Sequence, residues 1–355
     1  MRRVSHLWPA LVSFENLLRA SRNARRGKRS WPNVAAFEYD LEPELLTLQD
    51  DLETGRYRPG TYRTFKVHEP KERLISAAPY RDRVVHHAVL SVIEPIFEKV
   101  FIEGSHSCRK GKGTHKALDR FTHHARRHPW VLKTDISKYF PSIDLTILET
   151  LLARKIKDPR VLDLLDLIIH SSNPQEFVRA YFPGDDLFTP LTRRRGIPIG
   201  NLTSQFFANV YLDPLDHFVK EVLGAPGYLR YTDDIAVFGP DKRTLRLWRL
   251  QMEGFLARRL RLELHPRKTQ VFPVDQGTDF LGFRVFPDHR KLRKSTLTSR
   301  RRKLRRLVRD FGRGGIEIDR VRASIQSWLG HAGHGDTHGL RRAVLAELRF
   351  RRGTG

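Results

Sequence analysis

The sequence predicts an α+β fold, in which short strands and longer helices are mixed without the strict alternation of a doubly wound sheet. Apolar residues recur at helical spacing over several long segments, at 82–99, 145–157, 161–170, 202–222 and 243–260. Short, nearly continuous apolar runs typical of buried strands lie at 130–135, 228–231 and 235–239. Hydrophobic residues make up 39% of the 355 residues, enough for real cores.

The other elements follow in chain order. Residues 1–60 are expected to be mostly helical, and 62–79 predicts short strands joined by a turn at 69–72. A glycine-bearing loop at 107–114 precedes another helix, whereas the Pro- and Gly-rich stretch 173–196 predicts loop and turns.

The chain is strongly basic: 65 Lys and Arg residues against 40 Asp and Glu give a formal charge of +25. The densest run of cations lies in a segment after residue 288 that is predicted to be helical, and no acids balance it. Such a run repels itself unless phosphates lie nearby, so nucleic-acid contact is favoured over a solvated helix face. The cations expected to make this contact include Arg301, Arg302, Lys303, Arg305 and Arg306.

Composition excludes several classes of protein. A single cysteine leaves no disulfide framework and no multi-cysteine zinc site. No stretch reaches the about 18 apolar residues of a membrane span. The basic and apolar start is interrupted by Glu15 and Arg19, so it predicts a helix rather than a signal peptide. We therefore expect a cytoplasmic protein with no membrane partner.

Three aspartates stand where acids are unusual. Asp135 ends an apolar strand, and Asp233 and Asp234 are predicted at the tip of an apolar hairpin. Because burying unpaired carboxylates costs much free energy, a divalent cation would resolve the site, and oxygen ligands suit Mg²⁺. Two such ions about 3.5–4 Å apart form the clamp of in-line phosphoryl transfer. An Asp-Asp pair alone is more often an ordinary turn, but the strand-end acid and the basic chain favour the metal site.

The residues Tyr231, Thr232, Asp233 and Asp234 are similar to the YxDD box of reverse transcriptases, and 135–140 resembles the first-aspartate motif of that family. Three other segments match in the family's order between residues 65 and 285. The segment 196–205 resembles the motif that packs against template and nucleotide, Lys268 and Thr269 the later lysine motif, and 280–283 the primer-grip hairpin.

The subfamily is indicated by departures from the common pattern. Most bacterial reverse transcriptases have Gln before the glycine of the template-packing motif, whereas this chain has Ile199 before Gly200. This departure, together with 81–87 and 108–117, resembles the reverse transcriptases of diversity-generating retroelements among the group II intron-like bacterial enzymes.

The resemblance implies a right-hand polymerase fold. Its expected units are an N-terminal helical extension at 1–60, fingers at 61–130, a palm of antiparallel sheet and helices at 131–287, of which 150–200 belongs partly to the fingers, and a helical basic thumb at 288–355. It also implies an RNA-directed DNA polymerase, bacterial or phage-encoded, that copies a template-repeat RNA into mutagenised, error-prone cDNA. The implied partners are template RNA, the RNA–cDNA hybrid, dNTPs and an accessory variability protein oligomer.

The resemblance also implies roles for single residues. Asp135, Asp233 and Asp234 would hold two Mg²⁺ ions, for which Mn²⁺ could substitute, with the Ile136 carbonyl as a further ligand. Phe140 takes the place of the steric gate that excludes a ribose 2′-hydroxyl; the alternative is an ordinary core Phe.

Nucleotide and primer contacts are implied at a second set of positions. Lys71 and Arg73 would reach the triphosphate, or else be exposed turn charges. Lys268 would act as a general acid toward pyrophosphate, or else contact template or primer. Ile199 and Gly200 would face the nucleotide, and because Ile199 offers only apolar contact we expect raised misincorporation. The resemblance implies that these errors fall at template adenines. The primer grip would comprise Phe280, Leu281 and Gly282.

Alternatives stay open at this point. Another bacterial reverse transcriptase, from a retron, an abortive-infection system or a group II-like orphan, would carry the same boxes. A non-catalytic RNA-binding scaffold is disfavoured by the intact aspartates, and an RNA-copying RNA polymerase by Phe140.

Overall fold

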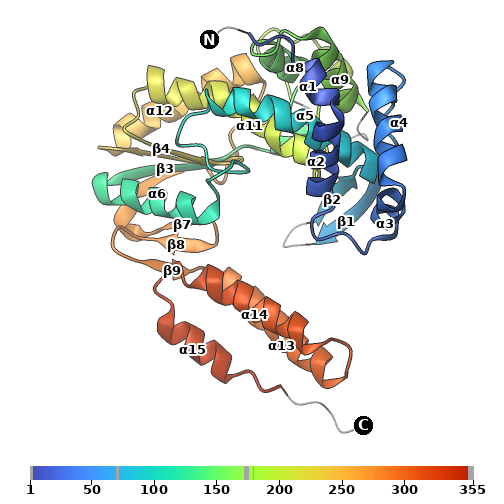
Figure 1. The fold of residues 1–355 in the computed structure, drawn as a ribbon. Helices are drawn as coiled ribbons and strands as arrows, with labels where there is room; N and C mark the ends of the chain where they lie inside the picture. The colour runs from blue at the N-terminus through green and yellow to red at the C-terminus, as the bar shows by residue number, and fades with distance from the viewer. Residues whose placement is uncertain (1–2, 69–71, 172–175, 179, 351–355) are drawn as a thin grey trace.

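The computed structural model describes residues 3–68, 72–171, 176–178 and 180–350 (Figure 1). Within these ranges the named strands form three sheets of two, four and three strands, all with antiparallel pairing. Helices lie between and around the sheets, which confirms the predicted α+β class. No helix in this part of the chain combines the length and the apolar character that crossing a membrane requires.

Helices fill the N-terminal segment, as predicted: α1 (Trp8–Val12), α2 (Phe14–Ala24), α3 (Pro32–Tyr39) and α4 (Leu41–Glu53). The first three contact α5 (Tyr80–Glu98). The hydroxyl of Ser13 caps α2 by accepting a hydrogen bond from the Asn16 N–H. The buried Asn16 amide also donates to the carbonyl of Ala88, which ties α2 to α5.

Strands β1 (Arg63–His68) and β2 (Glu72–Ala77) form the hairpin predicted at 62–79. Glu72 pairs with His68 and so lies in a strand rather than in the predicted turn. The other residues of that turn, including Lys71, lie outside the described residues. The hairpin lies on the same side of the molecule as α3 and α4 (Figure 1).

The four-stranded sheet has the order β4 (Gly227–Tyr231), β5 (Asp234–Gly239), β3 (Trp130–Asp135) and β6 (Gln270–Pro273). Val237 packs into the core shared with α11 (Leu202–His217) and α12 (Lys242–Phe255), whereas its neighbour Phe238 packs into the core beneath α6 (Thr114–Arg127). Both faces of the sheet are therefore covered, which explains why its strands are largely apolar.

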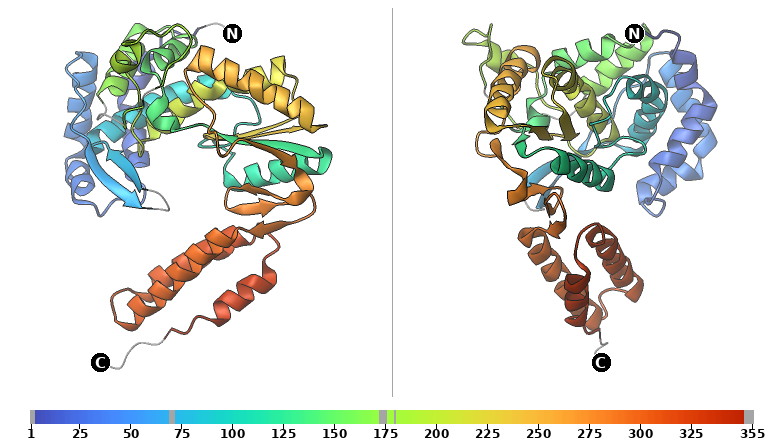
Figure 2. Two further views of the ribbon diagram at one scale, coloured as in Figure 1. Left: turned by 180° about the vertical axis from the view of Figure 1, so that it is seen from behind. Right: turned by 90° about the vertical axis from the view of Figure 1, so that its left-hand side faces the viewer.

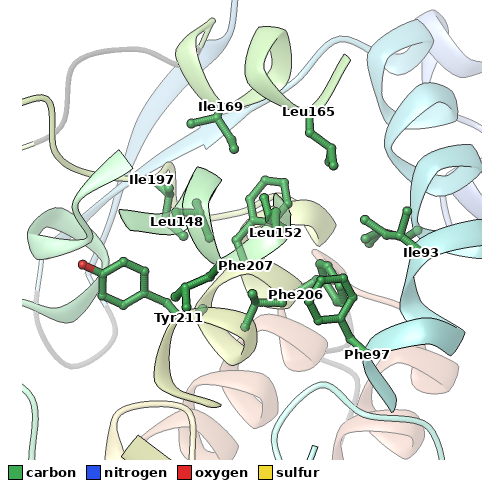
Figure 3. Packing of buried hydrophobic residues seen from close by; sticks show 14 of the residues in the cluster. Ile93, Phe97, Leu148, Leu152, Leu165, Ile169, Ile197, Phe206, Phe207 and Tyr211 are labelled. Atoms are coloured by element: carbon green, nitrogen blue, oxygen red, sulfur yellow. The ribbon is translucent and has the colours of Figure 1, made fainter. Parts of the chain in front are cut away.

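The larger core joins α5 and α11 to α8 (Leu145–Ala153) and α9 (Pro159–His170) (Figure 3). Phe97 of α5 meets Phe206 of α11 edge to face, with ring centroids 5.3 Å apart. Two predicted helices change type near their ends, because α11 continues as the π-helical η1 (Phe218–Val222) and α12 as the π-helical η2 (Leu256–Leu260). The helix predicted at 145–157 ends earlier, at Ala153. Two short helices complete this region, α7 (Tyr139–Ser142) and α10 (Thr189–Thr192).

The C-terminal part begins with a strand that the sequence did not predict. After the short η3 (Val274–Gln276), the three-stranded sheet consists of β7 (Thr278–Phe280), β8 (Phe283–Val285) and β9 (Arg290–Leu292), so the basic segment after 288 is not helical from its start. The helices α13 (Lys294–Gly312), α14 (Ile318–Ala332) and α15 (His338–Ala346) follow and pack around Leu304, Trp328 and Val344. They extend away from the central sheet (Figure 2).

Candidate active site

Strand pairing brings the three aspartates to one end of the central sheet. Asp135 at the end of β3 lies directly opposite Asp234 at the start of β5. Residues paired in this way point to the same face, with Cβ atoms about 4.5–5.5 Å apart. The Ile136 N–H donates to the carbonyl of Asp233, 3.2 Å away, which holds the β4–β5 turn against the end of β3.

The position of Asp234 differs from the prediction. Asp234 is the first residue of β5, and the turn consists of Thr232 and Asp233. Thr232 has φ 58°, the left-handed conformation that a two-residue hairpin turn demands. The apolar pattern predicts that the second strand begins after the acidic pair, whereas the strand ladder includes Asp234.

Two lysines engage the aspartates. Lys268 Nζ lies 2.6 Å from Asp135 Oδ2, and Lys133, two residues before Asp135 on the same face of β3, forms an ion pair with Asp234. The carboxylates of Asp135 and Asp234 are thus each turned to a different lysine. In the described residues, only Glu149, Asp166 and His170 place ligand atoms of three such side chains within 4.8 Å of one another. The compact trio of aspartate oxygens is therefore not formed in this conformation.

Burial and crowding of charge shape the electrostatics of the site. The pKa of Asp233 is raised, first by burial and then by the nearby charge of Asp135, while Lys268 and Arg73 oppose the shift. Burial lowers the pKa of Lys133 to about 8, against the attraction of Asp135 and Asp233. Carboxylate oxygens that crowd one another in a partly buried site are ligands that suit a hard divalent cation.

A buried network that the sequence analysis did not identify supports the aspartate turn. Arg230 of β4 and Asp216 of α11 have no exposed side-chain surface, and two hydrogen bonds of 2.7 and 2.6 Å join them. Arg230 also donates to the carbonyl of Thr232, 3.1 Å away, and the Thr232 hydroxyl donates to Ser107, 2.7 Å away. An arginine inside an otherwise apolar strand was the available signal, since such a residue requires a partner.

The segment after Gly196 is bound to β2. The carbonyl of Ile199 accepts a hydrogen bond from the Ser76 N–H at 2.9 Å, and the buried Asn201 amide donates to the Ser76 carbonyl at 3.0 Å. Gly200 has φ +120°, and a Cβ there would lie 2.8 Å from Ile75 Cγ2. Glycine is therefore required here both for its backbone conformation and for the close approach to β2.

Two of the predicted nucleotide-contacting residues, Arg73 and Phe140, belong to segments that meet this junction. Arg73 is exposed on β2, and its charge acts on Asp233. Phe140 is half-buried against the large core, and its carbonyl accepts a hydrogen bond from the Ile197 N–H at 3.1 Å. This hydrogen bond joins Phe140 to the segment bound to β2. Either predicted role of Phe140, gate or core residue, is compatible with its burial.

The predicted primer-grip residues form the β7–β8 turn. Phe280 pairs with Phe283, and the turn residues Leu281 and Gly282 have φ 45° and 89°. Phe280 is buried, and Lys133 Nζ lies 5.5 Å from its ring centroid. The Gly282 carbonyl accepts a hydrogen bond from the Arg293 N–H at 3.0 Å, so this turn connects the central sheet to the C-terminal helices.

A cavity of about 630 Å³ opens beside the aspartates. Its lining includes Asp135, Asp234, Lys133, Lys268, Arg284 and Arg293. The five cations predicted to contact nucleic acid lie further along, on α13. Arg302, Lys303, Arg305 and Arg306 are exposed, whereas Arg301 is half-buried and donates to Glu347 at 2.8 Å.

The fold and the site define a right-hand nucleic-acid polymerase. The central antiparallel sheet carries acids side by side at its end, the β1–β2 hairpin is bound to the segment before α11, and the C-terminal unit is helical and basic. Residues 66–285 match the family described as reverse transcriptase (RNA-dependent DNA polymerase), and the chain belongs to this family. Its class of activity is accordingly RNA-directed DNA polymerisation.

The curated relatives of the chain include a group II intron-encoded protein. It is 26% identical to Protein YkfC of Escherichia coli K12 over 294 residues, which cover 71% of this chain and 74% of that protein. It is 26% identical over 186 residues to the group II intron-encoded protein LtrA of Lactococcus lactis subsp. cremoris, covering 51% of this chain but only 29% of LtrA. Among solved structures, apo telomerase from Candida tropicalis, truncated from its C-terminal domain, matches with a TM-score of 0.49 and 12% identity over 68% of this chain and 58% of that chain.

Proposed function

We propose that this reverse transcriptase copies a template-repeat RNA into mutagenised cDNA for a diversity-generating retroelement, in a bacterial cytoplasm and from a bacterial or phage gene. The observation that carries the proposal is Ile199. Its carbonyl accepts a hydrogen bond from β2, and the neighbouring Gly200 lies so close to Ile75 that a Cβ would overlap with it. Position 199 thus carries an apolar side chain, whereas most bacterial reverse transcriptases have Gln before this glycine.

The proposed chemistry uses two Mg²⁺ ions held by Asp135, Asp233 and Asp234, with the Ile136 carbonyl as a further ligand and Mn²⁺ as a substitute. When bound, such a pair of ions activates the primer hydroxyl and stabilises the leaving pyrophosphate. Lys133 and Lys268 balance the carboxylates in the conformation described above. Lys268 would be free to donate a proton to pyrophosphate once its contact with Asp135 is given up.

The remaining side chains would position the nucleotide. Arg73, and Lys71 beyond the described residues, would contact the triphosphate. Phe140 would exclude the ribose 2′-hydroxyl. The primer grip at Phe280, Leu281 and Gly282 and the cations of α13 would hold the hybrid duplex, in a thumb at 288–355 that follows fingers at 61–130 and a palm at 131–287. An accessory variability protein oligomer is the proposed protein partner.

Fidelity tests the retroelement assignment. We expect wild-type protein with template RNA, dNTPs and Mg²⁺ to misincorporate opposite template adenines, and Ile199→Gln to do so several-fold less, because the amide can hydrogen-bond the nucleotide or its neighbours. Ile199→Leu is the matched control, since it stays apolar, and its cDNA should carry the wild-type errors. Identical error spectra for wild type and Ile199→Gln would contradict the proposed role.

A second candidate is a group II-like reverse transcriptase without mutagenic copying, which the similarity to LtrA favours. It predicts faithful cDNA from the wild-type chain at adenines as at other template bases. Sequencing cDNA from one adenine-rich RNA template therefore separates the two candidates.

A further inference from the structure

A groove outside the catalytic cavity is lined by arginines. It has a volume of about 550 Å³ and lies between α8, the end of α11, and the junction of α12 with η2. Arg154, Arg258, Arg259 and Arg261 line it, and no acidic residue does. None of its lining residues lines the cavity beside the aspartates. In Figure 1, α8 and α12 lie at the top of the molecule, whereas the basic C-terminal helices lie at the bottom.

The positive charge of this groove is not neutralised by the protein. Arg154, Arg258 and Arg259 are exposed, and within the described part of the chain no carboxylate forms an ion pair with any of them. Arg261 donates to Asp144 at 2.8 Å, but that carboxylate is buried and also contacts Arg193. Three exposed guanidinium groups in one concave surface repel one another unless an anion lies between them.

The local backbone holds these cations together. Arg258 and Arg259 lie in the π-helical η2, and Arg261 follows with φ 50°, a left-handed conformation that is unusual for arginine. π-Helical turns within helices are frequent at functional sites. The groove also has an apolar lining, in which Leu151 and Leu260 are buried. Ile147, Pro214 and Phe255 complete this lining and are half-buried.

We propose that this arginine groove binds the phosphodiester backbone of RNA outside the catalytic cavity. Guanidinium groups match phosphate oxygens bidentately, and an RNA template that extends well beyond the aspartates must cross the outer surface of the protein. The inference rests on the proposed function only in that the polyanion is the RNA that the enzyme copies. An acidic protein segment is the alternative occupant that the experiment distinguishes.

The test compares two double variants of the full chain. Arg258→Ala with Arg259→Ala removes two cations from the groove, and Arg243→Ala with Arg246→Ala removes two exposed cations from the other end of α12. Binding of a folded hairpin RNA is measured against salt concentration. For the groove variant we expect affinity to fall about tenfold near 0.1 M salt, and the log–log salt slope to fall by about 1–2, since each lost phosphate contact removes about 0.7–0.9.

Other measurements keep the outcome interpretable. Arg154→Ala, on the opposite wall, should weaken hairpin binding in the same direction. Extension of a primer–template too short to reach the groove from the aspartates should be unchanged in the groove variants. The inference is wrong if hairpin RNA binds the groove variant as tightly as wild type, or if the α12 control loses equal affinity. It is also wrong if only binding of poly-glutamate falls. If wild-type protein extends no primer, the proposed function fails instead.

Discussion

Arg230 of β4 and Asp216 of α11 form a doubly hydrogen-bonded ion pair with no exposed surface on either side chain. Tyr228 donates to the same carboxylate at 2.6 Å, and Arg230 reaches on to the Thr232 carbonyl. The pair therefore connects a core helix to the turn that carries Asp233. Its role is to fix the position of that turn rather than to contact substrate.

Breaking this pair from one side should be costly. Arg230→Met leaves Asp216 buried without its partner, so the free energy of unfolding should fall by about 3–5 kcal/mol. Urea denaturation followed by circular dichroism measures the change. Arg230→Met combined with Asp216→Leu is the control, because it leaves no unpaired charge and should be more stable than the single variant. Equal loss in the single and double variants would show that the uncompensated charge is not the cause.

The contrast between local and distant features explains what the sequence could predict. Features that depend on residues close together in the chain could be predicted from the sequence. They are the β3 strand ending at Asp135, the hairpin at 62–79 and the family motifs. The ion pair of Lys268 with Asp135 joins residues 133 positions apart, and nothing local in the sequence indicates it. The short strand β9 could not be predicted, because three residues within a run of charged residues are too few to show the alternation of apolar and polar side chains.

Gly200 provides a test of close packing at the β2 junction. Gly200→Ala should lose stability from two causes, the positive φ at about 1–3 kcal/mol and the overlap with Ile75, at about 1–3 kcal/mol more. Gly113 is a matched control, since its φ is +116° but a Cβ there meets nothing within 4 Å. Gly113→Ala should therefore lower the free energy of unfolding only by the cost of the positive φ. A Gly200 variant no less stable than the Gly113 variant in urea would argue against the overlap.

A buried histidine should make stability depend on pH. Burial, with the charges of His87 and Arg83, lowers the pKa of His86 to about 3. The unfolded chain takes up the proton near pH 6.5, well above the folded protein, so the free energy of unfolding should fall as pH drops from about 6.5 toward 3. His86→Leu should weaken this dependence in denaturation curves across that range. Replacement of the exposed His338 is the control, and a His86 variant with an unchanged pH slope would contradict the assignment.

The carboxylate of Asp233 is predicted to lower the stability of the fold while it is required for activity. Its raised pKa means that the ionised carboxylate is unfavourable in the folded protein. The carboxylate therefore lowers the free energy of unfolding most above the folded pKa, and this effect fades as pH falls below it. Asp233→Asn removes the charge while keeping the shape, and it should raise the thermal midpoint at pH 8 by about 1–3 °C. The same change should abolish primer extension on an RNA template, because it removes a proposed metal ligand. Asp275→Asn, at an exposed position, should leave both properties unchanged. An Asp233→Asn protein that still extends primers would remove this residue from the proposed catalytic set, and one that is less stable than wild type at pH 8 would show that the carboxylate is satisfied in the fold.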